Sequence, residues 1–319
     1  MKKVLVTGSS GFIGGHLVRL LKQKGCFVIG ADIVQPQYEK PHLFYNYDLR
    51  NNGLCRKIFT ENHRIEDVYN LGCLMGGMGY ISADKHAYDI MVGSSLILAN
   101  IIECSVAWKV KKIFFSSSAC VYNEDYQFSI SDCALKEEYA IPAKPDLVYG
   151  WQKLFGEMLH NSALVKGVDV RIARFHNIFG IEGIWDGGKE KYPAAICRKV
   201  AMAEDGDTIS IWGDGSQTRS YLNVAECLKT VMLLMDSNIT EPLNIGSDEL
   251  ISCNDLAKMV IEISGKKLNI KNDLTKPQGV RGRNSDNTKI KQLLGYAPQQ
   301  DLRGEMYRLY WWIYQQIYK

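Results

Sequence analysis

The sequence predicts an α/β protein whose core is a doubly wound parallel sheet. Residues 4–7, Val-Leu-Val-Thr, form a short β-branched run, and a glycine-rich segment at residues 8–14 follows directly. Leu17 and Leu21 then recur at helical spacing. The same alternation of short apolar runs with helical periods continues to about residue 177. Because parallel strands are buried on both faces and joined by helical crossovers, this rhythm indicates a parallel sheet covered by helices.

The positions of these runs predict the individual elements. Strands are expected at residues 4–7, 26–31, 45–49, 68–71, 113–115 and 170–175, and long helices at 83–107 and 146–166. Later segments predict short strands at 209–212 and 243–245, and helices near 193–203, 224–236, 253–264 and 303–317. We therefore expect a sheet domain at residues 1–177, to which later segments return. A smaller mixed α/β lobe, formed mainly by residues 178–319, would enclose a ligand cleft against it.

Composition excludes several classes of protein. Charged residues make up 23% of the 319 residues and the net charge is +3 without a basic run, which argues against nucleic-acid and membrane-surface binding. Nine cysteines at irregular spacing indicate neither a disulfide framework nor a metal site, and reduced thiols in a cytoplasm fit best. No apolar segment approaches the roughly 18 residues of a membrane span. We expect a soluble, cytoplasmic protein.

The glycine-rich segment has the context of a dinucleotide-binding turn. Gly8, Gly11 and Gly14 stand between the first expected strand and a helix, where glycines allow a tight turn and helix N–H groups face a pyrophosphate. Asp32 ends the next strand. A carboxylate there binds the adenosine ribose and repels a 2′-phosphate, which favours NAD over NADP. The alternative role for Asp32 is a plain strand-end cap.

Tyr149 and Lys153 are four residues apart on one expected helix and so share a face. An ammonium beside the phenol would lower the pKa of the tyrosine from about 10 towards neutrality and make it a base. The alternative is an ordinary pair on a helix surface. A serine-rich strand end at residues 116–118 offers a hydroxyl that orients substrate, whereas Cys120, which follows it, is equally consistent with a small buried apolar residue.

Two further features suit an anionic ligand. The glycines at 76, 77 and 79 follow a strand end, where backbone approaches ligands closely, although a flexible turn explains them as well. Five basic side chains in the second half are individually typical of solvated surface charges, but together they would form a diphosphate clamp if they converged; they are Arg198, Lys199, Arg219, Arg281 and Arg283.

The motifs at residues 8–14, 149–153 and 213–219, Gly-Asp-Gly-Ser-Gln-Thr-Arg, resemble those of the extended short-chain dehydrogenases that act on nucleotide-sugars. Further segments are similar to the branch of that family that epimerises GDP-mannose at carbons 3 and 5. These segments lie at residues 76–79, 117–120, 174–177, 188–191, 193–195 and 280–287. The resemblance covers nearly the whole chain and implies a Rossmann-type fold, an NAD-dependent isomerase and a nucleotide-diphosphate sugar, GDP-linked, as substrate.

The resemblance also implies roles for individual residues. NAD accepts a hydride from carbon 4 while Tyr149, activated by Lys153, takes the hydroxyl proton and Ser118 holds the oxygen. Cys120 and Lys191, the latter with a pKa lowered by partial burial, then exchange protons at carbons 3 and 5 from opposite faces. The cofactor contacts are Gly8, Gly11, Phe12, Ile13, Gly14, Asp32, Asp48, Tyr149 and Lys153. The substrate contacts are Gly79, Ser118, Asn177, Lys191, Lys199, Gln217, Arg219 and Arg281. His176 is expected to be structural. A homodimer through the helices at 83–107 and 146–166 is a further expectation from the family.

Departures from the family pattern leave other reactions open. Residues 121–123 and 71–74 differ from the usual sequences, and Tyr192 stands beside Lys191 where a small residue is typical, so the sugar pocket is expected to be reshaped. A 4,6-dehydratase would need acidic residues where Ala119 and Cys120 stand. A 4-epimerase, acting on another sugar such as a heptose, would not need the Cys–Lys pair. A non-catalytic NAD sensor would have no use for an activated tyrosine.

Overall fold

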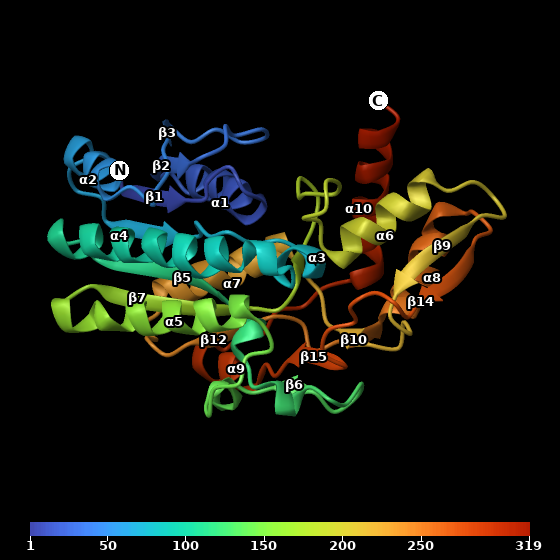
Figure 1. Ribbon diagram of the computed structural model, residues 1–319. Helices are drawn as coiled ribbons and strands as arrows, with labels where there is room; N and C mark the ends of the chain where they lie inside the picture. Colours follow the sequence, from blue (N-terminus) through green and yellow to red (C-terminus); the bar gives the residue numbers. More distant parts are fainter.

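The computed structural model describes residues 1–319 and contains a seven-stranded sheet in which every neighbouring pair is parallel. Its order is β12-β7-β5-β4-β1-β2-β3, so the strand order reverses between β1 and β4 (Figure 1). The strands are β1 (Lys3–Thr7), β2 (Phe27–Asp32), β3 (Leu43–Asn46), β4 (Asp67–Asn70), β5 (Lys112–Ser118), β7 (Asp169–Phe175) and β12 (Leu243–Ile245). Ligands of open α/β sheets bind at such a reversal, beyond the carboxyl ends of the strands.

Helices cover both faces of this sheet, and alternate strand residues supply the two cores. Val4 and Val6 of β1 belong to one core with α1 (Phe12–Gln23), α7 (Val224–Asp236) and α9 (Thr288–Leu294). Leu5 points into the opposite core with α2 (Asn52–Glu61), α4 (Ser94–Ala107) and α5 (Val148–Ser162). A strand with apolar residues at consecutive positions is buried on both faces. The predicted doubly wound α/β fold is confirmed.

A second lobe has its own core of 17 buried residues. It consists of α6 (Tyr192–Met202), α8 (Cys253–Ser264) and α10 (Leu302–Ile317) around β9 (Thr208–Trp212), which pairs with β14 (Asn269–Asp273). Figure 1 shows this lobe to the right of the large sheet. Three segments from the second half, α7, β12 and α9, pack in the large sheet domain instead. The domain boundary at residue 177 stays a prediction.

A small four-stranded sheet has the order β13-β10-β15-β6. Its strands are β13 (Ile251–Ser252), β10 (Thr218–Arg219), β15 (Gly282–Ser285) and β6 (Ala134–Leu135). The register of β10 and β15 sets Arg219 opposite Arg283. The remaining short elements are α3 (Met78–Ile81), β8 (Ile178–Phe179), β11 (Leu222–Asn223) and the helical turns Asp84–His86, Asp89–Gly93, Ala119–Val121, Glu124–Tyr126, Glu137–Ala140 and Leu164–Lys166.

Two expectations about secondary structure were wrong. The third strand ends at Asn46 and not at residue 49. The Asp48 carboxylate accepts a hydrogen bond from the backbone N–H of Arg50, two residues further on, and this bond closes a turn there. In addition, the helical turns before α4 run into it, so that Asp84–Ala107 is a helical stretch long and apolar enough to cross a membrane by length and composition. This corrects the expectation that no segment reaches that length. Several of its apolar residues, including Leu98 and Ile101, pack against the sheet.

Candidate active site

The glycine turn after β1 brings backbone into very close contact. Gly8 has φ +68°, and its N–H donates to the carbonyl oxygen of Ala31 at 2.9 Å. A Cβ added at Gly14 would lie 2.0 Å from the Gly8 carbonyl oxygen, so only glycine lets α1 start this close to β1. Gly11, the residue before α1, makes no side-chain cap, which leaves the first N–H groups of the helix available to a ligand.

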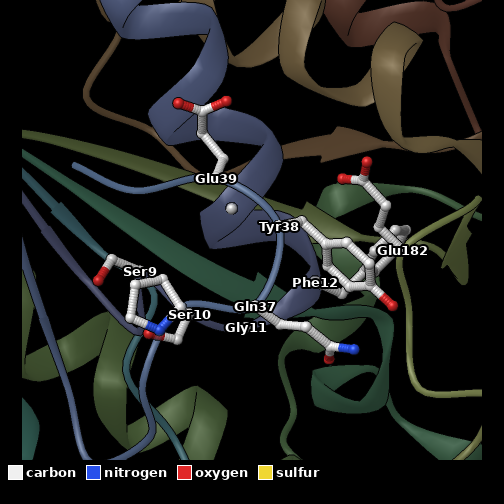
Figure 2. A pocket seen from close by; sticks show the side chains of 10 residues that line it. Ser9, Ser10, Gly11, Phe12, Gln37, Tyr38, Glu39 and Glu182 are labelled. Atoms are coloured by element: carbon white, nitrogen blue, oxygen red, sulfur yellow. The ribbon is translucent and has the colours of Figure 1, made fainter.

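A pocket lies against this turn, between residues 9–12 and the segment 36–39 that follows β2 (Figure 2). Glu182 from the second lobe closes one side of it and pairs with Arg19 of α1 at 3.0 Å. The hydroxyls of Ser9 and Ser10 are buried and have no partner within the protein. Buried hydroxyls normally form hydrogen bonds. These two, together with the open start of α1, suit the phosphate oxygens of a dinucleotide.

Asp32 links the end of β2 to the same turn. Its carboxylate accepts a hydrogen bond from Ser10 N at 3.0 Å and another from Val34 N at 3.1 Å. Burial raises the pKa of Asp32, and these backbone bonds oppose the rise. These two contacts show that Asp32 caps backbone N–H groups at the end of β2. Its carboxylate has further lone pairs that are free to accept hydrogen bonds from a ligand. Asp48 instead binds the Arg50 guanidinium at 2.7 Å, which holds its pKa below the ordinary value. Both cofactor assignments stay predictions.

The carboxyl ends of β1 and β4 meet beside the turn. Thr7 Oγ accepts hydrogen bonds from Leu71 N at 3.1 Å and Gly72 N at 3.0 Å. A Cβ on Gly8 would lie 3.0 Å from the Leu71 carbonyl group. The unusual segment at residues 71–74 therefore borders the cofactor turn, and it carries Cys73, whose sulfur lies 3.4 Å from Lys153 Nζ.

Tyr149 and Lys153 are both buried on α5, which rules out a pair on the helix surface. Lys153 Nζ donates to the carbonyl oxygen of Ser116 at 2.7 Å and lies 5.7 Å from the centre of the Tyr149 ring. Burial raises the pKa of Tyr149 well above its ordinary value, the charges of Cys73 and Cys120 add to this, and a hydrogen bond with Ser118 opposes it. The expected lowering towards neutrality is therefore wrong for this structure. Loss of water disfavours the phenolate, and the ammonium is bonded to Ser116 and not to the phenol.

Cys120 stands in the short turn Ala119–Val121 directly after β5. Its N–H donates to Ser118 Oγ at 3.2 Å, so the predicted hydroxyl at the strand end holds this turn. A Cβ added at Gly150 would lie 2.1 Å from the Cys120 carbonyl oxygen. The start of α5 therefore packs against the cysteine, whose sulfur accepts a hydrogen bond from Arg283 Nη1 at 3.2 Å. Cys120 is partly exposed, unlike a cysteine that only fills a core.

Lys191 precedes α6 and belongs to a loop that packs on the glycine segment at residues 76–79. Gly77 N donates to the Lys189 carbonyl oxygen at 2.9 Å, and a Cβ on Gly77 would lie 2.2 Å from the Glu190 carbonyl oxygen. Burial lowers the pKa of Lys191, which is the predicted direction, and the electrostatic interaction with Cys120 opposes the shift. The glycine segment at residues 76–79 and the loop at 188–191, more than 100 residues apart in the sequence, thus pack against one another.

The predicted substrate contacts form two groups. Two of them lie near the small sheet. Arg219 donates a hydrogen bond to Val280 O at 2.7 Å, and Arg281 donates one to the Asp214 carboxylate at 2.9 Å. Gln217 donates to Trp212 O at 2.9 Å, and a Cβ on Gly79 would lie 3.4 Å from the Trp212 ring. This group therefore gathers around Trp212 and Asp214.

The other predicted contacts are tied to backbone elsewhere. Lys199 Nζ donates to Ser210 O at 2.6 Å, and burial lowers its pKa. Asn177, with φ +46°, donates to Ser220 O at 3.0 Å. Arg198 binds Glu190 at 2.7 Å, so it does not join a clamp, and the five basic side chains do not all converge.

Two remaining expectations concern Tyr192 and His176. The Tyr192 hydroxyl donates to the Cys253 carbonyl oxygen at 2.7 Å and its ring packs on the second-lobe core. Its influence on the sugar pocket stays a prediction, and these contacts direct its side chain towards the second-lobe core. His176 is buried and shares a hydrogen bond of 2.8 Å with Asn244 Oδ1, and burial lowers its pKa to about 3. Its other ring nitrogen, Nδ1, is buried without a partner, and its structural role stays a prediction.

Sequence reasoning missed the surroundings of the Cys120 sulfur. Arg283 was grouped with possible diphosphate ligands, and neither Asp146 nor Gln127 was considered, yet both accept hydrogen bonds from the Arg283 guanidinium. Asp146 lies 137 residues from Arg283, and Gln127 lies 156 residues from it. No local pattern joins such distant positions. Backbone bonds from Arg281 N and Gly282 N to Gln127 O bring the segment that carries Arg283 to this loop.

A model of the NAD dependent epimerase/dehydratase family matches residues 4–246. The chain belongs to this family. Its match to GDP-mannose 3,5-epimerase of Arabidopsis thaliana is 42% identical over 324 residues, covering 99% of this chain and 83% of that protein. A reductase of Streptomyces, dTDP-4-dehydro-6-deoxy-D-allose reductase, is 26% identical over 309 residues, 93% of this chain and 92% of that protein.

Solved structures have the same fold. UDP-glucose 4-epimerase of Thermotoga maritima, solved with UDP-glucose, superposes with a TM-score of 0.85 at 25% identity, covering 99% of each chain. UDP-glucuronic acid 4-epimerase of Bacillus cereus, solved with UDP-glucuronic acid and NAD, has a TM-score of 0.82 at 23% identity over 98% of this chain and 99% of that one. The member described here is thus an NAD-dependent nucleotide-sugar epimerase, and the glycine turn with its unpartnered serine hydroxyls fits that cofactor.

Proposed function

We propose that this chain is a GDP-mannose 3,5-epimerase. The proposal rests on one observation. The three proposed proton-transfer groups, Tyr149, Cys120 and Lys191, share one environment. Gly150, the residue after Tyr149, packs against the carbonyl oxygen of Cys120, and Cys120 is near enough to Lys191 to influence its pKa. The relative from Arabidopsis thaliana with 42% identity bears the same activity in its name. Cys120 and Lys191 have no role in simple hydride transfer, so their presence beside Tyr149 favours a reaction that also breaks C–H bonds.

Tyr149 and Ser118 are proposed to act on the hydroxyl of carbon 4. NAD, when bound at the glycine turn, supplies a reversible hydride acceptor. Tyr149 takes the hydroxyl proton, and Ser118, at the end of β5, orients the oxygen. The Lys153 ammonium is buried beside the ring, where a positive charge stabilises the phenolate as it forms.

Cys120 and Lys191 are proposed to invert carbons 3 and 5. A ketone at carbon 4 acidifies the hydrogens on both neighbouring carbons. Inversion then requires an acceptor on one face of the ring and a donor on the other, since a single group returns its proton to the same side. Cys120 reaches the site from the end of β5, whereas Lys191 arrives from the start of α6 in the second lobe. Their different origins support the assignment to opposite faces.

The nucleotide end of the substrate is proposed to contact the group around Trp212. Gly79, Gln217, Arg219 and Arg281 gather there, and Lys199 stands on α6 beside β9. The guanidinium of Arg281 now binds Asp214 and Ser216 Oγ. Arginine binds phosphate oxygens in a forked geometry. The diphosphate would therefore compete with Asp214 for this side chain.

The rival reactions are distinguishable. A 4,6-dehydratase needs acidic side chains after β5, and Ala119 and Cys120 occupy that place. A 4-epimerase is favoured by the fold of the Thermotoga maritima structure, but it needs no thiol. Replacing Cys120 by Ala therefore leaves a 4-epimerase active, whereas it abolishes inversion at carbons 3 and 5.

The decisive experiment is incubation with GDP-mannose and NAD in deuterated water, followed by NMR of the sugar ring. We expect deuterium at carbons 3 and 5 and its loss in the variant Cys120→Ala. Inversion at carbon 4 alone, without exchange at either neighbour, would identify a 4-epimerase. Release of water from carbon 6 would identify a dehydratase, and no change with GDP-mannose contradicts the proposed substrate.

We further propose a homodimer through α4 and α5 in a cytoplasmic enzyme. The two helices pack against one another and carry a row of exposed apolar side chains: Tyr88, Met91, Val92 and Leu96 in and before α4, and Trp151, Phe155 and Met158 on α5. Apolar patches of this kind mark protein interfaces. Light scattering should give twice the chain mass, and Trp151→Glu should give monomers. The nine free cysteines support a reducing compartment.

A further inference from the structure

A single arginine of α1 joins the two segments that flank the pocket beside the glycine turn. Arg19 Nη2 donates to both carboxylate oxygens of Glu182 at 3.0 Å, and its Nε donates to Glu39 Oε2 at 3.4 Å. Glu39 belongs to the segment that follows β2, and Glu182 to the segment that follows β8. Both side chains line the pocket (Figure 2). One guanidinium is therefore bonded to both walls.

The wall that carries Glu182 is held by α1 at a second point. His16, which precedes Arg19 by three residues and shares its helix face, forms a hydrogen bond of 3.0 Å with Ile181 O. Glu182 itself has φ +63°, a conformation that residues other than glycine rarely adopt. Such a conformation persists only where the surrounding contacts hold it. The contacts of His16 and Arg19 therefore keep this wall of the pocket in place.

The segment at residues 36–39 is also held from two sides. Lys22 of α1 donates to Glu39 Oε1 at 2.5 Å, and this bond lowers the pKa of Glu39. Tyr38, the preceding residue, reaches α10 of the second lobe, where its ring meets the Trp312 ring edge to face with the ring centres 6.3 Å apart. The segment thus connects the helix after the glycine turn with the second lobe.

The two carboxylates stand beside the buried hydroxyls of Ser9 and Ser10, which suit phosphate oxygens. Unpaired carboxylates at this place would repel a diphosphate. Arg19 neutralises both, so shielding of charge is one consequence of its position. Shielding does not require one cation to reach partners on both walls, nor a left-handed backbone at Glu182. The arrangement therefore fits a closure that ties the two walls together.

We propose that Arg19 is a clasp that closes the cofactor site between the sheet domain and the second lobe, and so retains the dinucleotide through the catalytic cycle. Epimerisation changes the oxidation state of neither the sugar nor the cofactor, so the hydride taken from the sugar must return from the same cofactor molecule. A site that released the reduced cofactor would leave an oxidised sugar behind. Release requires the pairs of Arg19 with Glu39 and Glu182 to break.

The test follows the cofactor and needs no sugar. The enzyme is loaded with deuterium-labelled NAD and mixed with a large excess of unlabelled NAD. Rapid desalting at intervals, followed by mass spectrometry of the protein-bound nucleotide, gives the dissociation rate. Because no turnover is measured, the result does not depend on which nucleotide-sugar is the substrate.

Three single variants separate closure from shielding. Arg19→Met removes the cation and leaves both carboxylates. Glu182→Gln breaks the pair with the second lobe and also removes a negative charge beside the pocket. Arg56→Met is the matched control, because Arg56 of α2 forms an ion pair with Glu103 of α4 on the opposite face of the sheet.

We expect Arg19→Met to speed dissociation by about fivefold or more, because it frees both walls, and Glu182→Gln to speed it by about threefold. Shielding alone predicts slower dissociation in Glu182→Gln, since a charge that repels phosphate is gone. Arg56→Met should leave the rate unchanged. Reversal of both charges, Arg19→Glu with Glu182→Arg, should release the cofactor more slowly than Arg19→Glu alone.

An unchanged rate in Arg19→Met, a slower one in Glu182→Gln, or an equal acceleration in Arg56→Met overturns the proposal. So does release from the wild-type enzyme that is complete before the first desalting. If Arg19→Met does not fold, Glu182→Gln decides alone, because it removes only one of the pairs. Absent deuterium exchange with GDP-mannose would contradict the proposed function and leave these dissociation rates standing.

Discussion

Gly150 and the carbonyl oxygen of Cys120 are so close that a Cβ at position 150 would lie 2.1 Å from that oxygen. The obstacle is backbone and cannot rotate away. This contact sets Tyr149, the residue before the glycine, beside the cysteine turn after β5. One glycine therefore positions both the proposed proton acceptor of the hydride step and the proposed thiol of the epimerisation step.

Replacing Gly150 by Ala should push the start of α5 away from Cys120. Overpacking of this kind costs about 1–3 kcal/mol of stability, and urea unfolding measures it. Turnover should fall more steeply than stability because Tyr149 moves with the helix. The control is Gly53→Ala in α2, where the new Cβ meets only the Asn51 side chain. Equal activity of both variants would show that the close approach is not needed.

Replacing Lys191 by Met should stabilise the fold at neutral pH while it abolishes exchange at carbons 3 and 5. Burial lowers the pKa of Lys191 in the folded state, so the unfolded chain holds the proton more tightly. Folding therefore disfavours the charged form of Lys191, which costs the wild-type protein free energy of unfolding. This cost is largest at pH values below the pKa of the folded state, and it disappears as the pH rises towards the pKa of the unfolded state, about 10.5. Urea unfolding of both proteins at several pH values should show the stability gap closing at high pH. A variant less stable than wild type at neutral pH contradicts this.

The raised pKa of Tyr149 predicts a phenol that stays protonated at neutral pH until a positive charge arrives. Burial is the largest cause of the rise. The oxidised nicotinamide ring is cationic and should lower the pKa on binding. Adding NAD should therefore produce a tyrosinate difference spectrum that is absent in Tyr149→Phe. The reduced cofactor, whose ring is neutral, should produce a smaller signal, and equal signals would exclude the electrostatic explanation.

A buried ion pair behind the site should matter for stability. Arg174 and Glu157 meet at 2.8 Å with side chains 6% and 5% exposed, and Ser117 also donates to Glu157. Replacing Glu157 by Gln leaves Arg174 with an uncompensated charge, which should destabilise the protein by about 3–5 kcal/mol. The double replacement of both residues by Met should recover most of this loss in urea unfolding. Additive effects would show that the two side chains are not coupled.

Local sequence patterns predicted most of the elements and the cofactor turn. The helices α7 and α8 begin and end where the apolar periodicity does, because that periodicity depends on residues close along the chain. The glycine at position 14 was recognisable because its neighbour in space, Gly8, is six residues away. By contrast, β14 and β15 were missed, since Asn269–Asp273 and Gly282–Ser285 have few of the apolar residues that mark strands.

The sequence by itself determined the doubly wound sheet and the glycine turn, since each is encoded within a few consecutive residues, and its resemblance to a family supplied the proposed reactive side chains. Only the tertiary structure decided their chemical state. Burial by distant segments raises the pKa of Tyr149 and lowers that of Lys191, and strand pairing brings Arg283 to Cys120 from 163 residues away. Desolvation and charge act through space, so they depend on which segments the fold brings together.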